Sequence, residues 1–323
     1  MATRSPLLSV IIPVYKNESN LDRLLPELDR VAGLAPGPIE VVFIIDGSPD
    51  RCLQILRERL PRARFSSRLV SLSRNFGSFN AIRGGLEVAS GEYFAVIAAD
   101  LQEPPELVLQ FLDALRHGKA DIAFGIRSTR SDPILDEAAS RAFWWTYRRF
   151  VLPDLPAGGV DVFGCNRIVR DRLVELREAS GNLIGLLFWI GYRRVYVPYE
   201  RRARLEGRSA WTLGKKLRYG FDSVFNFTDL PIRLLLGVGA IGTLSAVAFA
   251  LVVLVAKLTN GIDVPGYTPI ALSVTFFGSI TSLGLGILGQ YLWLVLQNTR
   301  GRPNYLIERV EDFSPGADAP KGP

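Results

Sequence analysis

The chain has 323 residues, 48% of them hydrophobic and 22% charged, with a net charge of +6 and a mean hydropathy of +0.18. This apolar fraction excludes disorder as the main state, and a positive mean hydropathy beside so many charges indicates two compositions, one globular and one lipid-soluble. Two cysteines and one histidine exclude a disulfide framework and a Cys/His zinc site, while the positive charge suits anionic partners such as phosphates or an acidic membrane face.

Short apolar runs alternate with amphipathic stretches over residues 7–126. The apolar runs predict strands at 9–15, 39–45, 68–73, 93–99 and 121–126. The stretches between them predict helices at 20–31, 50–60, 78–89 and 105–116. This alternation is typical of a mostly parallel sheet covered by helices on both faces, where ligands collect beyond the carboxyl ends of the strands.

Polar residues follow four of these predicted strands, at 15–18, 46–50, 73–77 and 100–105. Neither a GxGxxG fingerprint nor a GxxxxGK[ST] loop occurs, which disfavours a dinucleotide-binding half and excludes a P-loop ATPase. Asp46 and Asp100, expected at adjacent strand ends, favour a nucleotide held through its base, its ribose and a divalent metal. Taken singly, each aspartate could cap a helix or shape a turn, and capping is the favoured explanation of either one.

Two long uncharged segments account for the apolar excess. Residues 234–256 contain no charged residue, and a second uncharged run extends over 264–299 with its most apolar part at 269–296. Each is long enough to cross a hydrocarbon core about 30 Å thick. The sequence therefore predicts a membrane hairpin with spans at about 233–257 and 269–296.

The charges that flank this hairpin predict its orientation. Residues 200–233 are rich in arginine and lysine, and arginines recur at 300, 302 and 309, whereas the connector carries only Asp263. Positive charge favours the cytoplasmic side, so both termini are expected in the cytoplasm and the connector outside. The apolar stretch before Lys16 is too short for a signal peptide.

Several motifs lie in a fixed order along the chain: VIIPVYKNE, DGSPD, SRNFG, ADLQEPPE, GGVDVFGCNR, VPYERRARLEGRSAW and, after the hairpin, RGRPNYLIE. Together they resemble family 2 glycosyltransferases of the GT-A fold. More narrowly, the chain resembles polyisoprenyl-phosphate glycosyltransferases, the relatives of dolichol-phosphate mannose synthase that carry a C-terminal membrane hairpin. The resemblance implies an α/β, Rossmann-like GT-A domain that binds a nucleotide sugar, followed by two transmembrane helices.

The resemblance also implies roles for individual residues. The nucleotide sugar would be bound by Pro13, Tyr15, Glu18, Asp46, Asn75, Asp100 and Arg127. Asp100 and Gln102 match the metal-binding motif and would hold Mg²⁺ or Mn²⁺. Asp161 matches the catalytic acid placed near the sugar and the acceptor, although its spacing alone would suit a turn residue. The lipid phosphate would be bound by Arg201, Arg204 and Ser209.

Four regions follow from these assignments. We expect a cytoplasmic catalytic domain at 1–198, a basic juxtamembrane segment at 199–231, the two spans within 232–297 and a cytoplasmic tail at 298–323. Glycines and serines recur in both spans and permit close packing of helices, so a homo-oligomer is expected. The expected location is the inner membrane.

The expected reaction is inverting transfer of a sugar from a nucleotide diphosphate sugar, such as UDP-glucose, to an undecaprenyl or dolichyl phosphate. Membrane lipids are expected partners, and nucleic acid is not. Two departures from the family pattern stand against this reaction, because Ile45 and Ala98 occupy positions that often carry acids. They favour the alternative of a non-catalytic scaffold that binds nucleotide sugars. A processive polysaccharide synthase is disfavoured, because only two spans and no QxxRW motif occur.

Overall fold

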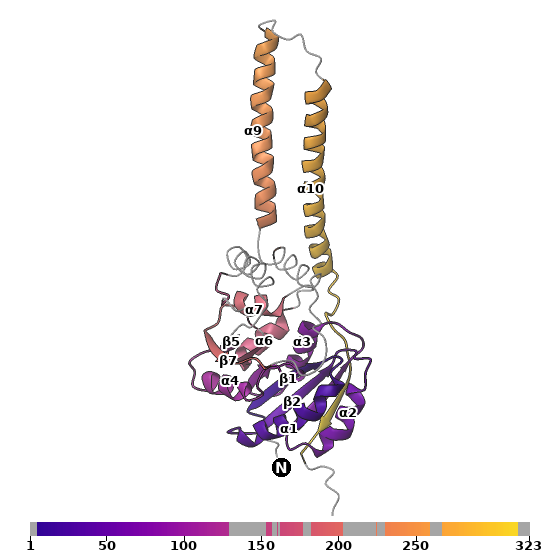
Figure 1. Cartoon of the computed structure of the whole chain (residues 1–323), viewed down its shortest axis with the longest axis vertical. Helices are drawn as coiled ribbons and strands as arrows, with labels where there is room; N and C mark the ends of the chain where they lie inside the picture. Colours follow the sequence, from indigo (N-terminus) through magenta and orange to yellow (C-terminus); the bar gives the residue numbers. More distant parts are fainter. Residues whose placement is uncertain are drawn as a thin grey trace, which may run out of the picture. The chain divides into compact units, whose positions relative to one another are not determined.

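A computed structural model describes residues 5–128, 153–156, 160, 162–176, 182–202, 224, 230–258 and 267–315. Two compact units make up the chain: Met1–Lys216 with Pro303–Pro323, and Leu217–Arg302. The first unit contains a sheet with helices on both faces, and the second contains two long helices (Figure 1).

The described strands of the first unit form one eight-stranded sheet in the order β7-β5-β6-β4-β1-β2-β3-β8. Their bounds are β1 Leu8–Val14, β2 Ile39–Ile45, β3 Ser66–Leu72, β4 Tyr93–Val96, β5 Ile122–Arg127, β6 Val162–Asn166, β7 Arg194–Tyr199 and β8 Ile307–Phe313. Strands β1 to β4 are mutually parallel, as the sequence predicts, and so are β5 and β7. The sheet is nevertheless mixed, because β6 runs antiparallel to β4 and β5, and β8 runs antiparallel to β3.

Helices alternate with the first strands at the predicted places. The described helices of this unit are α1 Glu18–Leu34, α2 Cys52–Arg59, the short 3-10 helix η1 Leu60–Arg62, α3 Ser78–Val88, α4 Leu107–Arg116, α6 Arg167–Glu175 and α7 Leu183–Trp189. In α1 the buried leucines recur at helical spacing, which gives the helix one apolar face toward the sheet.

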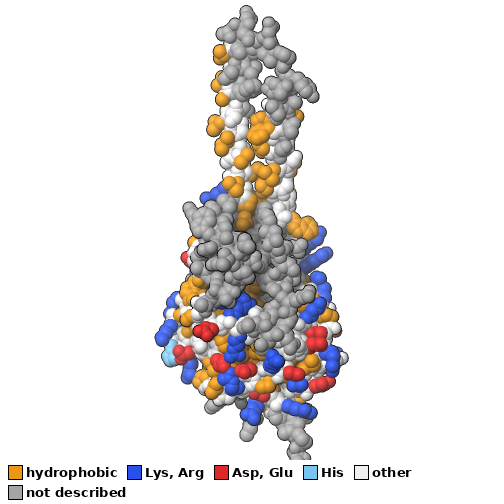
Figure 2. Space-filling model, viewed as in Figure 1, with side chains coloured by type: hydrophobic (Ala, Val, Ile, Leu, Met, Phe, Trp, Pro, Cys, Tyr) orange, Lys and Arg blue, Asp and Glu red, His pale blue; other side chains and the backbone are white. Residues whose placement is uncertain are grey.

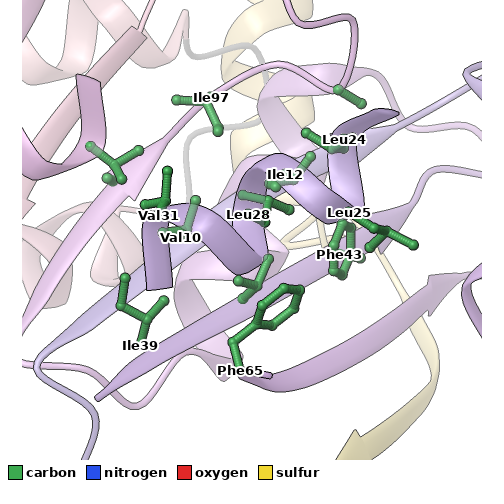
Figure 3. Close-up of a cluster of buried hydrophobic side chains, with 14 of the residues drawn as sticks. Val10, Ile12, Leu24, Leu25, Leu28, Val31, Ile39, Phe43, Phe65 and Ile97 are labelled. Carbon is green, nitrogen blue, oxygen red and sulfur yellow. The ribbon is translucent and has the colours of Figure 1, made fainter. Parts of the chain in front are cut away.

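Alternation along the strands divides the core between the two faces of the sheet. Val10 and Ile12 of β1 and Phe43 of β2 pack with α1 in a cluster that also includes residues of α4 (Figure 3). The opposite face packs against α3, where a Cβ built on Gly85 would lie 2.6 Å from both Ile11 Cγ2 and Ile44 Cδ1. This glycine lets α3 approach the sheet closely.

Part of the segment predicted as a cytoplasmic tail, residues 298–323, joins the sheet of the first unit. Residues 307–313 form β8 and extend the sheet at β3, with Leu72 opposite Ile307 and Ser67 opposite Phe313. Sequence reasoning missed this strand because it is highly charged and mostly exposed, as edge strands commonly are.

The described part of the second unit includes α9 (Leu230–Leu258) and α10 (Tyr267–Thr299), which contain the two predicted spans. They pack antiparallel, because a Cβ on Gly284 would lie 3.2 Å from Leu235 Cδ1 and one on Gly242 3.5 Å from Phe277 Cε1. Within the described residues, one stretch, Phe276–Thr299, is long and apolar enough to cross a membrane by itself. The span at about 233–257 therefore remains a prediction.

Candidate active site

The sheet topology brings most of the predicted site to one edge. Parallel strands β1 to β5 and β7 end there, and the antiparallel strands β6 and β8 begin there. Tyr15, Asp46, Asn75, Asp100 and Arg127 thus follow or end strands at the same edge. Asp161 directly precedes β6, but Asp161, Arg204 and Ser209 lie outside the described residues. Asp46 and Asp100 do not follow adjacent strands, because β1 lies between β2 and β4.

The loops after β1 and β2 are joined by reciprocal hydrogen bonds at the starts of α1 and α2. The Asp50 carboxylate accepts the Glu18 N–H at 3.2 Å, and the Glu18 carboxylate accepts the Arg51 N–H at 2.9 Å. The Lys16 N–H donates to Ser48 Oγ at 2.7 Å. Glu18, predicted to contact the nucleotide, is therefore also part of the bracing of this loop.

Tyr15 and Pro13 occupy the end of β1. Tyr15 is 40% exposed, and Lys16 Nζ lies 5.4 Å from the centroid of its ring. Pro13 is partly buried and pairs with Ile44 of β2. An exposed aromatic ring at a strand end is well placed to stack on a planar ligand group.

Asp46 is the most buried of the predicted site residues within the described part of the chain, with only 2% of its surface exposed. Its carboxylate accepts the Phe76 N–H at 2.7 Å and the Gly77 N–H at 2.9 Å. The Asn75 amide donates to the Asp46 carbonyl at 3.1 Å. Burial raises the pKa of Asp46 above its ordinary value, and the two N–H donors oppose that rise. Asp46 thus holds residues 75–77, and the interpretation of it as a cap of α2 is wrong.

Gly47 makes this close approach of two loops possible. Its φ is +58°, and a Cβ there would lie 2.4 Å from the Asn75 nitrogen. Any side chain would therefore separate the Asp46 loop from the β3–α3 loop.

The predicted metal-binding loop has an unusual backbone. Leu101 adopts φ +57°, a conformation that non-glycine residues rarely take, while its side chain is only 6% exposed. The Gln102 N–H donates to Asp100 Oδ1 at 3.3 Å. Strained backbone of this kind is often found where side chains are aimed at a ligand.

Arg201 joins two sites that the sequence treats as separate. Its guanidinium donates to the side-chain oxygen of Gln102, and the Arg202 N–H donates to the Gln102 carbonyl at 2.8 Å. The segment after β7, predicted to bind the lipid phosphate, therefore lies on the predicted metal loop. Arg127, at the end of β5, pairs with Tyr199 of β7 and belongs to the same edge.

The donor atoms of this loop suit a hard cation that shares phosphate oxygens. Asp100 supplies a carboxylate and Gln102 an amide oxygen, both oxygen ligands of the type that Mg²⁺ and Mn²⁺ prefer. Within the described part of the chain, no group of three or more His, Cys, Asp or Glu residues could hold a metal ion. Asp100 and Gln102 would fill only part of the coordination shell of such a cation.

The two departures from the family pattern differ in burial. Ile45 is 4% exposed and belongs to the core cluster beneath α1, whereas Ala98 is partly exposed just after β4. Ile45 therefore stabilises the strand end, and only the Ala98 position borders the loop that carries Asp100.

A groove of about 710 Å³ lies beside the loop that carries Asp100 and Gln102. Its charges are largely paired, with Arg30 bound to Glu27 and Glu106, and Asp22 2.8 Å from Arg59. The residues that line it are Asp22, Arg23, Pro26, Glu27, Arg30, Leu101 and Arg202. Paired charges do not favour a strongly anionic ligand there.

Residues 9–176 match the glycosyl transferase family 2 domain. A Bacillus subtilis protein, CsbB, is 33% identical over 315 residues, which cover 98% of this chain and 94% of that protein. An undecaprenyl-phosphate 4-deoxy-4-formamido-L-arabinose transferase of Pseudomonas paraeruginosa is 30% identical, covering 96% and 92% of the two chains. A bactoprenol glucosyl transferase of Shigella phage SfII is 27% identical, covering 95% and 99%. The family match and these near full-length similarities show that the chain is a member of glycosyl transferase family 2.

Proposed function

We propose that the protein is an inverting glycosyltransferase that moves a sugar from a nucleotide diphosphate sugar to a polyprenyl phosphate at the cytoplasmic membrane face. The observation that carries this proposal is the gathering of Tyr15, Asp46, Asp100, Arg127 and Arg201 at one edge of the sheet. Two relatives support the acceptor class, because their names specify transfer to undecaprenyl phosphate or bactoprenol. Those names specify different sugars. UDP-glucose or another UDP-hexose is our proposed donor.

The donor would lie over the ends of β1, β2 and β4. Tyr15 would stack on the base, and the loop that Asp46 braces would border the ribose. A Mg²⁺ or Mn²⁺ ion on Asp100 and Gln102 would neutralise the diphosphate as it leaves. Arg201 and Arg127 would add fixed positive charge at the same place, where negative charge develops in the transition state.

The acceptor needs little help from a base. A phosphate monoester has a second pKa near 6, so most of it is dianionic at neutral pH. One of its oxygens would attack the anomeric carbon opposite the diphosphate, forming the new C–O bond as the bond to the diphosphate breaks. Asp161 would be the catalytic residue closest to this step, either as a base or by orienting the acceptor and stabilising the sugar.

The membrane hairpin would hold the protein at the bilayer that contains the lipid acceptor. The described side chains of α9 and α10 include many exposed large apolar residues, such as Leu244 at 71% and Val274 at 68% (Figure 2). Apolar surface of this extent is typical of a lipid-facing surface. The basic segment at 199–231, with Arg201, Arg204 and Ser209, would meet the lipid phosphate where the chain enters the membrane.

The test is a substrate panel with the purified full chain in detergent. The protein is incubated with Mg²⁺ or Mn²⁺, with UDP- and GDP-sugars in turn, and with polyprenyl phosphate, and the lipid product is analysed by mass spectrometry. We expect one monoglycosylated lipid, and a loss of about 10²-fold or more in rate for Asp100→Asn and Asp161→Asn. Asp113→Asn is the matched control, because Asp113 is exposed on α4, and it should retain full activity.

The outcomes separate this proposal from its alternatives. A panel that yields no glycolipid, although the protein binds a nucleotide, would overturn the proposal and favour a nucleotide-sugar-binding scaffold. Cellular function that survives Asp100→Asn and Asp161→Asn would point the same way. A product with many sugars on one lipid would instead indicate a processive synthase.

A further inference from the structure

The residues that follow α10 return to the predicted nucleotide edge of the sheet. The Leu306 carbonyl accepts the Ser73 N–H at 3.1 Å, which continues the β3–β8 ladder by one bond beyond Leu72. The Tyr305 hydroxyl donates to Glu87 Oε2 of α3 at 2.7 Å. Residues 303–313, which we name the C-terminal strap, therefore contact both the end of β3 and the side of α3.

The contact between the strap and α3 depends on a glycine. A Cβ built on Gly84 would lie 3.2 Å from Tyr305 Cε2 and 3.3 Å from Cδ2. If a Cβ were present at Gly84, the ring would have to shift. The ring therefore packs on α3 at a position that has no side chain. The neighbouring residue, Gly85, faces the sheet at Ile11 and Ile44. These two adjacent glycines let α3 pack closely on both the sheet and the strap.

Between the two contacts lies the loop that Asp46 holds. Ser73 immediately precedes residues 74–77, and α3 begins immediately after them at Ser78. The N–H groups of Phe76 and Gly77 are the donors to the Asp46 carboxylate. The strap thus contacts the chain on both sides of a short loop whose backbone amides bind Asp46, a predicted nucleotide contact.

We propose that the C-terminal strap holds this loop in its nucleotide-binding conformation and that Tyr305 is a positioning residue for the donor site. The proposal rests on the proposed function for the identity of the ligand. Because Tyr305 contacts α3 at Glu87 and Gly84, its effect on the donor passes through the placement of α3 and of residues 74–77.

The far end of the strap provides an internal control. Arg57 of α2 donates to Glu311 Oε1 at 2.9 Å, and Arg68 Nε lies 3.2 Å from Asp312 Oδ1. Glu311 pairs with Leu69 in the middle of β3, four residues before Ser73. Loss of the Arg57–Glu311 pair should therefore loosen the strap only at its far end, which does not contact residues 74–77.

The test compares hydrogen exchange and nucleotide binding in the detergent-solubilised full chain. Tyr305→Ala should accelerate exchange of the amides at residues 76 and 77 and weaken binding of UDP or GDP, measured by calorimetry. The expected change is about fivefold or more in each, the factor that corresponds to one lost hydrogen bond. Tyr305→Phe, which keeps the ring, should show a smaller change in the same direction. Glu87→Gln keeps a hydrogen-bond acceptor and should behave as the unaltered protein does.

Arg57→Ala should accelerate exchange within β8 and leave residues 76 and 77 and nucleotide affinity unchanged. The proposal is overturned if Tyr305→Ala and Tyr305→Phe leave exchange at residues 76 and 77 unaltered, or if Arg57→Ala raises it as much as they do. If Tyr305→Ala does not fold, Tyr305→Phe decides by the same readouts. An unaltered protein that binds neither UDP nor GDP would contradict the proposed donor, while exchange at residues 76 and 77 would still decide the role of the strap.

Discussion

Two aspartates four residues apart show how the partner of a carboxylate sets its role. Asp46 turns back to the β3–α3 loop, and Asp50 reaches across to the first turn of α1. Both accept backbone N–H groups, which is what a capping interpretation of either residue would suggest. The loops that they hold are nevertheless distant in the sequence, with Phe76 30 residues after Asp46 and Glu18 32 residues before Asp50.

Replacing Asp46 should therefore affect stability and ligand binding together. Asp46→Ala leaves the partly buried N–H groups of Phe76 and Gly77 without their acceptor, at an expected cost of about 1 kcal/mol each before relaxation. Asp46→Asn keeps one acceptor oxygen and should lose less. Chemical denaturation measures the first effect, and calorimetry with UDP and GDP the second. Asp22→Ala, at an exposed position, is the control, and equal losses in the two alanine variants would contradict this account.

At the scale of elements, the strands β5, β6 and β7 are joined at the edge opposite the predicted site. The Asp121 carboxylate accepts Arg193 Nε at 3.0 Å and the Asn166 amide at 3.0 Å. Hydrogen bonds from Arg193 lower the pKa of Asp121 below its ordinary value, although partial burial opposes the shift. The ionised carboxylate is thus the form that stabilises these strands.

The hydrogen bonds of the Asp121 carboxylate predict how the stability of the protein depends on pH. An acid with a lowered pKa in the folded state contributes stability above its unfolded pKa, near 4, and loses that contribution as the pH falls through the folded value. Since Arg193 is 65% exposed, the contribution should be about 1 kcal/mol or less. Thermal unfolding at pH 7 and at pH 3 measures it. The difference in stability between the unaltered protein and Asp121→Asn should shrink at pH 3, and a constant difference would contradict the assignment.

The packing of α3 on the sheet predicts opposite effects for two glycine replacements. Gly85→Ala would place a methyl group 2.6 Å from Ile11 and Ile44, so we expect a loss of about 1–3 kcal/mol as α3 moves outward. Gly33→Ala in α1 meets nothing within 4 Å and should instead stabilise the protein by about 0.5–1 kcal/mol. The two variants are compared by the denaturant concentration at the midpoint of unfolding, measured on the full chain in detergent. A Gly85→Ala variant as stable as Gly33→Ala would show that α3 does not pack as described.

At the scale of the whole molecule, the proposed topology makes a prediction about labelling. With both termini inside and the connector outside, Gly261→Cys should react with a membrane-impermeant maleimide in intact cells, whereas Ser5→Cys should react only after permeabilisation. The native thiols give little background, because Cys52 and Cys165 are fully buried and burial raises the pKa of Cys52 to about 12. The reverse pattern, with Ser5→Cys labelled from outside, would overturn the orientation.

Much of this protein follows from local sequence pattern. The strands and helices within residues 8–127 lie within a few residues of their predicted positions. The spacing of apolar residues is a local property of the sequence. A strand such as β2 or a helix such as α1 can therefore be predicted without knowledge of its neighbours in the fold. The uncharged segments likewise coincide with α9 and α10, because helix length and apolar composition need no tertiary partner. The motifs also identified the family that the domain match confirmed.

Only the tertiary structure decided which strands are neighbours and which partners the polar groups have. The placement of β1 between β2 and β4, the antiparallel β6 and the attachment of β8 to β3 all pair residues distant in the chain. The contacts of Arg201 with Gln102 and of Tyr305 with α3 are of the same kind. A hydrogen bond between distant segments produces no periodic pattern in the sequence of either segment, because the bond depends on how the whole core is packed. Sequence therefore determined the elements and the family, and packing decided how those elements meet at the predicted site.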